Sequence, residues 1–229
     1  MMRQAEDTCR ELKLEILGGH TEITRVVAQP LISVTGVGKI RKEELLNPSG
    51  IRPGMDLVVS KWIGLEATSI LVKEREERLK ERFSPEFIRT ARSFDQYLSV
   101  VPDARAAKAA GAAAMHDITE GGVFGAFWEM ASAGNVGLEI DLRAVPIRQE
   151  TVEICEFFGV NPYQIMSSGS MMIAAEDGQA VVRALRDAGI PGTVVGRTTE
   201  GRARILRNGE EIRYLDKPQP DELYRALEE

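Results

Sequence analysis

Apolar and polar positions alternate along most of the chain in a way that predicts short buried strands separated by helices. Residues 55–60 (MDLVVS) and 170–175 (SMMIAA) are apolar runs of strand length, whereas Leu65, Val72 and Leu79 can share one face of a helix. The predicted strands are 55–60, 114–116, 137–141, 170–175, 193–197, 203–206 and 211–214. The predicted helices are 66–82, one opening at Pro85, 104–114, 122–133, 148–158, 179–188 and a short one from Pro220. This mixture predicts an α/β (α+β) fold in which a mixed sheet carries helices layered on one face.

The first 52 residues follow a different pattern, with too few elements for a domain of their own. Residues 3–13 have the composition of a helix, while 14–17 and 30–35 are predicted strands that each run into a glycine turn. The chain starts without a helix cap, as though inside an element. Turn-forming residues concentrate between 47 and 54, so we place a boundary there and expect two parts, residues 1–52 and 53–229.

Several local signals mark where the predicted elements begin and end. Ser84 is placed to cap the helix that Pro85 opens, and Gly111 is expected to break the alanine-rich helix. The pair Asn208-Gly209 between two predicted strands is a strong hairpin signal. The charged run 73–82 is interpreted as the solvated face of a helix rather than as a binding patch.

Composition and charge narrow the classes of function. The 229 residues are 43% apolar, 28% charged and 6% aromatic, which is typical of a globular protein. The net charge is −6, and no basic run is free of interleaved acids, so nucleic acid is not an expected partner. No apolar stretch approaches the roughly 20 residues of a membrane span, so no membrane partner is expected. Cys9 and Cys155 lie far apart and no signal peptide is evident, which predicts free thiols in a cytoplasmic protein.

The first candidate site is the segment 17–22 (LGGHTE), where a predicted strand runs directly into two glycines. Gly18 and Gly19 would let backbone N–H groups approach an anion, because neither carries a Cβ. Thr21 could then contact phosphate oxygen and Glu22 could bind Mg²⁺, with His20 as a neighbour. A plain glycine turn with a solvent-facing histidine explains the same pattern about as well.

The second candidate site is the segment 115–122 (MHDITEGG). Its two glycines, Gly121 and Gly122, open a predicted helix, whose first N–H groups and dipole can hold an anion. Asp117 beside them could orient a substrate amine or act on a proton, and Thr119 could contact phosphate. The alternative is that Asp117 or Thr119 only caps the helix.

Two further turns have the same character. Residues 62–69 (WIGLEATS) lead from a strand through Gly64 to a helix start that carries Thr68, and residues 167–170 (SSGS) precede a strand. Each turn by itself has a structural explanation. Four such turns in one chain indicate a phosphate-rich ligand.

Taken in order, these motifs resemble the aminoimidazole ribonucleotide synthetase superfamily, which includes enzymes of purine biosynthesis, a hydrogenase maturation factor, selenophosphate synthetase and thiamine-monophosphate kinase. Residues 18–22 are similar to its GG-x-T signature, 53–59 (PGMDLVV) to the opening of its C-terminal domain, and 116–122 (HDITEGG) to its D-x-T-x-GG element. Residues 64–69 are similar to the glycine loop that follows that opening. The resemblance covers the whole chain.

The resemblance implies roles for both parts of the chain. Residues 1–52 would be the last part of an incomplete N-terminal domain for ATP binding and dimerisation, and 53–229 a nearly complete C-terminal domain. ATP and Mg²⁺ are the implied cofactors, a small-molecule or phosphorylated substrate the implied ligand, and a homodimer the implied assembly. The implied residues are Asp117 and Thr119 in catalysis, Glu22 as a metal ligand, and Gly18, Gly19, His20, Thr21, Glu22, Gly64, Thr68, Gly121 and Gly122 in cofactor binding.

The chain also departs from the superfamily pattern. The glycine-rich segment and aspartates that bind ATP and Mg²⁺ upstream of the GG-x-T element are not in this sequence, and the last residues lack the terminal cysteine of the hydrogenase maturation factor. We therefore expect a portion of an ATP-dependent enzyme that phosphorylates an amide-type oxygen, inactive as this chain alone. Two alternatives stay open: a non-catalytic remnant that binds a ligand or holds a dimer, and a small-molecule kinase.

Overall fold

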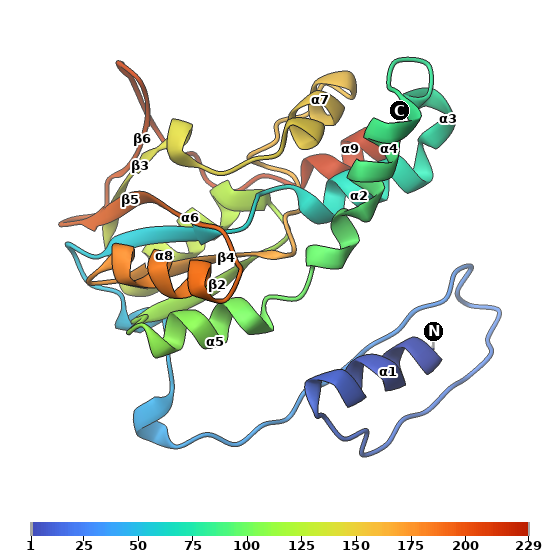
Figure 1. Cartoon of the computed structure of the whole chain (residues 1–229), viewed down its shortest axis with the longest axis horizontal. Coiled ribbons are helices and arrows are strands. Elements are labelled where there is room, and N and C mark those ends of the chain that lie inside the picture. Colours follow the sequence, from blue (N-terminus) through green and yellow to red (C-terminus); the bar gives the residue numbers. More distant parts are fainter. Residues whose placement is uncertain (1, 229) are drawn as a thin grey trace. The chain divides into compact units, whose positions relative to one another are not determined.

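A seven-stranded mixed sheet is the centre of one part of the computed structural model, which describes residues 2–228 (Figure 1). The strands are β1 (Asp56–Ser60), β2 (Ala114–Ile118), β3 (Gly137–Asp141), β4 (Ser170–Ala175), β5 (Gly192–Thr199), β6 (Arg204–Asn208) and β7 (Glu211–Tyr214). They lie in the order β2-β4-β1-β5-β3-β6-β7. All neighbouring strands are antiparallel except β3 and β6, which are parallel. The predicted α+β class with a mixed sheet is confirmed.

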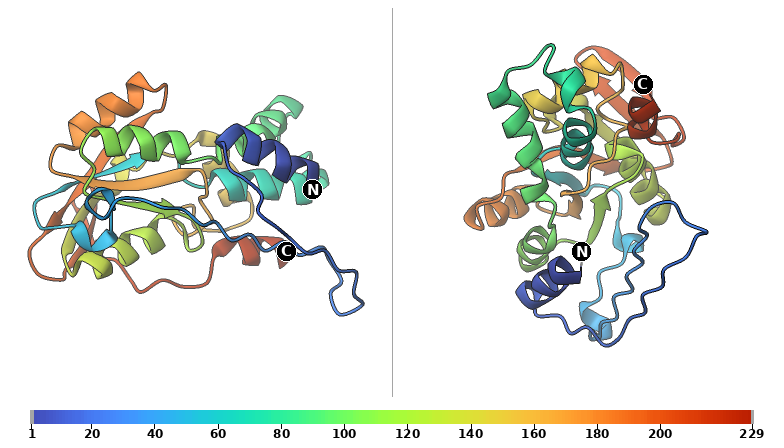
Figure 2. Two further views of the ribbon diagram at one scale, coloured as in Figure 1. Left: turned by 90° about the horizontal axis from the view of Figure 1, so that it is seen from below. Right: turned by 90° about the vertical axis from the view of Figure 1, so that its right-hand side faces the viewer.

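Helices cover both faces of the sheet. Helix α6 (Gly122–Gly134) packs with Leu57 and Val59 of β1 in one core cluster, whereas α5 (Val101–Ala109) and α8 (Gly178–Asp187) pack with Val58 in another. Figure 2 shows the two layers on opposite sides of the strands. The expectation of helices on one face is therefore corrected. All six residues of β4 are buried, because alternate side chains of this strand point into two different cores.

A cluster of helices lies beyond one end of the sheet and has a core of its own (Figure 1). Its members are α2 (Leu65–Glu74), α3 (Glu76–Leu79), α4 (Pro85–Arg92), α7 (Gln149–Phe157) and α9 (Glu222–Glu228). Short 3-10 turns connect the elements at Lys42–Glu44, Pro48–Gly50, Ser93–Tyr97 and Leu142–Ala144. None of the helices formed by residues 2–228 is long and apolar enough to cross a membrane.

Most of the local predictions are confirmed, and one helix is divided. Ser84 accepts a hydrogen bond from the N–H of Phe87 and caps α4, and Gly209 has φ +66° in the turn between β6 and β7. The predicted helix 66–82 instead breaks at Arg75, whose φ and ψ are −124° and 28°. Leu79 is fully buried after this break. The charged run has no apolar stripe that would hold one straight helix against the core.

The chain divides into two compact units, Met1–Lys42 and Glu43–Glu229. In the first unit, α1 (Met2–Leu12) confirms the predicted helix, but residues 14–17 and 30–35 form no strand. A strand needs a partner for its N–H and C=O groups, and this unit provides none among its described residues. The expectation of two strands here is therefore wrong. Apolar side chains such as Leu17 and Ile23 are 87% and 99% exposed. That residues 1–52 are the end of an ATP-binding domain stays a prediction, as does a boundary near residue 53.

Candidate functional site

Three of the four candidate turns meet at one end of the sheet. Because β4 runs antiparallel to both β1 and β2, its first residue lies beside their last ones, and Ile118 is paired with Ser170. The N–H of Met171 donates to Ser60 Oγ at 3.2 Å, which fixes β1 at the same level. We call the segments 60–69, 118–122 and 165–170 the three-turn junction. Each had been singled out in the sequence for its small residues, but their proximity could not be read from it.

Ser167 ties the three turns together from a buried position. Its Oγ accepts the N–H of Gly64 at 2.8 Å and donates to the carbonyl of Ile165 at 2.8 Å, and its own N–H donates to the carbonyl of Thr119 at 3.3 Å. One serine therefore sets the spacing of the turn after β1, the turn after β2 and the segment before β4.

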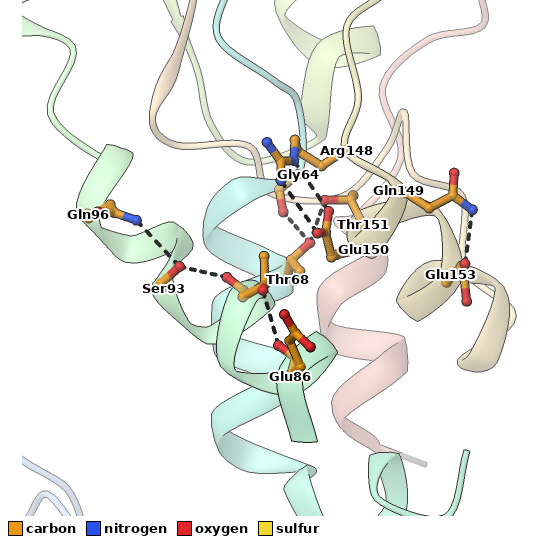
Figure 3. Close-up of polar contacts among 11 residues, drawn as sticks. Gly64, Thr68, Glu86, Ser93, Gln96, Arg148, Gln149, Glu150, Thr151 and Glu153 are labelled. Carbon is orange, nitrogen blue, oxygen red and sulfur yellow. Dashed lines mark hydrogen bonds and ion pairs between the residues drawn. The ribbon is translucent and has the colours of Figure 1, made fainter. Parts of the chain in front are cut away.

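The turn at Gly64 is closed by buried hydroxyl groups, shown in Figure 3. Thr68 Oγ1 lies 2.6 Å from the carbonyl oxygen of Gly64 and 2.9 Å from Thr151 Oγ1. Gly64 has φ +73°, and a Cβ there would lie 2.5 Å from Thr151 Cγ2. Glycine is thus required at Gly64 by backbone conformation and by space. Gly64 and Thr68 both have partners within the chain, and their contact with a cofactor stays a prediction.

The start of α6 receives a carboxylate from the other end of the chain. The N–H of Gly121 donates to Asp221 Oδ2 at 2.7 Å, while Asp221 Oδ1 accepts the N–H groups of Met166 at 3.1 Å and Leu223 at 2.8 Å. Asp221 is only 3% exposed. Its carboxylate lies where the sequence assigned an external anion, at the positive end of a helix.

Two further N–H groups around this turn also have partners. Gly122 donates to the carbonyl of Thr119 at 3.1 Å, and Phe124 donates to the carbonyl of Tyr163 at 3.1 Å. Gly121 and Gly122 have φ values of +78° and +63°, so both need the left-handed conformation that glycine adopts freely. Ligand binding by these two glycines stays a prediction. The sequence analysis missed Asp221, which it placed inside the short helix predicted from Pro220; the observed helix α9 begins one residue after it, at Glu222.

Asp117 and Thr119 are two polar side chains at the turn after β2 that the protein leaves available. Within the part of the chain that the structure describes, neither the Thr119 hydroxyl nor the Asp117 carboxylate makes a hydrogen bond. The Asp117 side chain is 61% exposed on the edge strand β2, and its Oδ1 lies 3.8 Å from His116 Nδ1. His116 Nε2 lies 3.2 Å from Glu129 Oε2. A ligand could reach Asp117 and Thr119 without breaking a hydrogen bond, and their roles in catalysis stay predictions.

A buried ion pair supports the end of β1, and nothing in the sequence indicated it. Lys61 Nζ donates to Asp103 Oδ2 at 3.1 Å and to the carbonyls of Tyr97 and Ser99 at 3.0 and 2.8 Å. The second oxygen, Asp103 Oδ1, accepts the hydroxyl of Ser60 at 2.5 Å. The side chains of Lys61 and Asp103 are 7% and 1% exposed. All three ammonium protons have an acceptor, so the pair positions the three-turn junction and is not free to bind a ligand.

Two titratable side chains near α9 are shifted toward their neutral forms. Burial, with a contribution from Glu222, raises the pKa of Cys155 to about 12, so this cysteine stays a thiol at neutral pH. The hydroxyl of Tyr224 donates to Glu120 Oε1 at 3.2 Å, and this hydrogen bond raises the pKa of Tyr224. Both cysteines are free thiols, as predicted.

The fourth turn belongs to the unit Met1–Lys42. Gly18, Gly19, His20, Thr21 and Glu22 are exposed and lie outside helices and strands. Among residues 2–228, no group of three or more histidine, cysteine, aspartate or glutamate side chains is placed to hold a metal ion. Glu22 as a magnesium ligand stays a prediction.

Comparison with known proteins shows the family of the part of the chain that contains the three-turn junction. Residues 52–207 match the family described as AIR synthase related protein, C-terminal domain. The chain is 27% identical over 204 residues to the carbamoyl dehydratase HypE of Cupriavidus necator, covering 87% of this chain and 54% of that protein. It is 31% identical over 198 residues to the selenide, water dikinase of Methanocaldococcus jannaschii, covering 77% of this chain and 53% of that protein.

A solved structure of the hydrogenase maturation protein HypE in complex with ATP superposes with a TM-score of 0.60 at 18% identity. The match covers 82% of this chain and 57% of that one. The chain thus spans about half the length of each of these three proteins.

Proposed function

The chain belongs to the AIR synthase-related family, and on this basis we propose that it supplies the substrate-binding, C-terminal part of an ATP-dependent enzyme that activates an amide-type oxygen by phosphorylation. In this proposal the substrate is a small, phosphorylated or phosphate-accepting molecule, the protein works as a homodimer in the cytoplasm, and the chain is inactive alone. The observation that carries the proposal is the three-turn junction. It lies within residues 52–207, and it joins the turns after β1 and β2 through Ser167.

The roles proposed for individual residues rest on the side chains in or beside the three-turn junction that make no hydrogen bond among the described residues. In phosphoryl transfer a protein contributes mainly positioning and neutralisation of charge. We assign the Thr119 hydroxyl to a substrate or phosphate oxygen and the Asp117 carboxylate to orienting a substrate N–H or taking its proton. Gly121 and Gly122 hold the backbone of this turn in its left-handed conformation, which keeps Thr119 in place.

The nucleotide side of the proposal rests on the unit Met1–Lys42. Gly18, Gly19 and Thr21 are assigned to the phosphates of ATP and Glu22 to Mg²⁺, with His20 nearby. The ATP complex of HypE supports ATP as the nucleotide.

One alternative activity has a specific observation in its favour. The similarity to a selenide, water dikinase supports a transfer of phosphate to the substrate itself, as in a small-molecule kinase. Release of inorganic phosphate together with a dehydrated or cyclised product would support the proposed function, and a stable phosphorylated product would support a kinase. A remnant that binds a ligand or holds a dimer would give neither product.

We predict that this chain by itself binds MgATP weakly or not at all. The residues assigned to the phosphates lie in an exposed segment without regular structure, so no cradle of N–H groups is preformed for a triphosphate. Isothermal titration calorimetry of the chain with MgATP measures this directly, with MgCl₂ alone as the control. A micromolar dissociation constant would show that the chain holds a complete nucleotide site and would overturn the assignment of residues 1–52.

A further inference from the structure

Strand β7 forms an open edge of the sheet. It is the last strand in the order and pairs with β6 alone, through a hairpin whose turn residues are Gly209 and Glu210. All four of its residues, Glu211 to Tyr214, are exposed. An edge strand presents a row of N–H and C=O groups that can pair with another strand.

The side chains of β7 are divided by kind between its two faces. Ile212 lies opposite Arg207 and Tyr214 opposite Ile205, so these two side chains share one face of the sheet. Ile212 is 55% exposed and Tyr214 is 71% exposed. Glu211 and Arg213 lie opposite Asn208 and Leu206 and share the other face. The edge therefore combines an apolar face with one acid and one base two residues apart.

Strand β7 is short and carries two charged side chains, but it has neither a proline nor a bulge to prevent pairing. Its ladder with β6 runs in register from Asn208 to Tyr214. The ladder also continues past the strand, because the N–H of Leu215 donates to the carbonyl of Arg204 at 2.8 Å. The edge is short but regular, and a second strand could lie along it.

We propose that β7 pairs with β7 of a second copy of this chain, antiparallel and about a two-fold axis at Ile212. The two copies of Ile212 then face each other, and Glu211 of each copy lies opposite Arg213 of the other. Such a contact is isologous and closes after two copies. This inference gives an interface for the homodimer of the proposed function, but it does not depend on the proposed reaction, because it uses residues outside the three-turn junction.

The charges select this register over its neighbours. An axis at Arg213 would place the two arginines opposite each other, which is unfavourable for like charges. An axis between Ile212 and Arg213 would place Ile212 opposite Arg213 and leave Glu211 opposite Tyr214. Only the axis at Ile212 pairs both acids with both bases and matches the two isoleucines.

The test uses the full chain and two charge reversals. Glu211→Arg gives a strand with two bases, and Arg213→Glu gives a strand with two acids, so each variant repels its own copies. Mixing the two variants restores both opposite-charge pairs in a mixed dimer. Circular dichroism and melting of each variant control for folding, since both side chains are exposed. The contact is small, so sedimentation velocity is run over a series of protein concentrations.

The proposal predicts that the wild-type sedimentation coefficient rises with concentration, that each single variant loses this rise, and that the equimolar mixture regains it. Self-association in the single variants equal to that of the wild type would overturn the proposal. Loss of association without recovery on mixing would also overturn it, because opposite charges on the two strands would then fail to pair.

Discussion

Replacing Asp103 by Ala is expected to lower the free energy of unfolding by about 3–5 kcal/mol, because it leaves the buried Lys61 ammonium without its counter-charge. The ammonium would keep only the carbonyls of Tyr97 and Ser99, and the Ser60 hydroxyl would lose its acceptor. Urea unfolding at neutral pH measures the change. A loss below about 1 kcal/mol would mean that the pair contributes no more than a surface ion pair.

Two controls separate charge from packing at this site. Glu176→Ala removes an exposed partner of Arg52 at 2.8 Å, where the side chains are 69% and 76% exposed, and should cost less than about 1 kcal/mol. The double variant Lys61→Met with Asp103→Leu removes both buried charges and should recover most of the stability lost in Asp103→Ala. No recovery would indicate that shape, rather than the unpaired charge, dominates the loss.

Gly122→Ala is expected to destabilise the protein by about 2–5 kcal/mol, the sum of strain in the left-handed conformation and overpacking. A Cβ at Gly122 would lie 2.6 Å from the carbonyl oxygen of Tyr163 and 2.9 Å from both N and O of Ile165. These are backbone atoms of the segment that leads to Ser167, so relieving the clash displaces the three-turn junction.

Gly121→Ala is the matched control for this prediction. Its φ of +78° is similar, but the nearest atom to an added Cβ, Gly125 Cα, lies at 3.7 Å. Only the conformational strain of about 1–2 kcal/mol is then expected. Chemical denaturation of both variants gives the difference. Equal losses would show that the contact with Tyr163 and Ile165 is not tight in solution.

Local sequence patterns were sufficient to predict those strands and turns whose conformation depends mainly on their own residues. The strands 137–141, 170–175 and 211–214 have the predicted bounds, since apolar runs between turn residues leave little choice of conformation. The hairpin at Asn208-Gly209 was predicted because a two-residue turn requires positive φ, which Gly209 has at +66°.

Contacts between distant residues could not be predicted in this way. Asp221 is 100 residues from Gly121, and Asp103 is 42 residues from Lys61, so no periodicity relates them. The prediction that helices lie on one face of the sheet was wrong. Strand β4 is buried on both of its faces, so helices must cover both sides of the sheet. Residues 14–17 have a strand-like pattern, but without a neighbouring strand the pattern has nothing to pair with.

The central claim is that the three-turn junction binds a phosphorylated ligand through Thr119. Inorganic phosphate is the probe, and thermal melts are recorded across a phosphate series at fixed ionic strength, which excludes general salt effects. The variants are Thr119→Val, which removes a hydroxyl without a partner in the described chain, and Thr90→Val on α4, which removes a hydroxyl outside the junction.

Binding predicts that phosphate stabilises the wild type and Thr90→Val by the mass-action term, about 2.7 kcal/mol at a hundredfold excess over the dissociation constant. Thr119→Val should lose most of this gain while melting like the wild type in the absence of phosphate. Melting temperatures that stay flat with phosphate, or that rise in parallel for all three proteins, would contradict the claim and leave the three turns with a structural role alone.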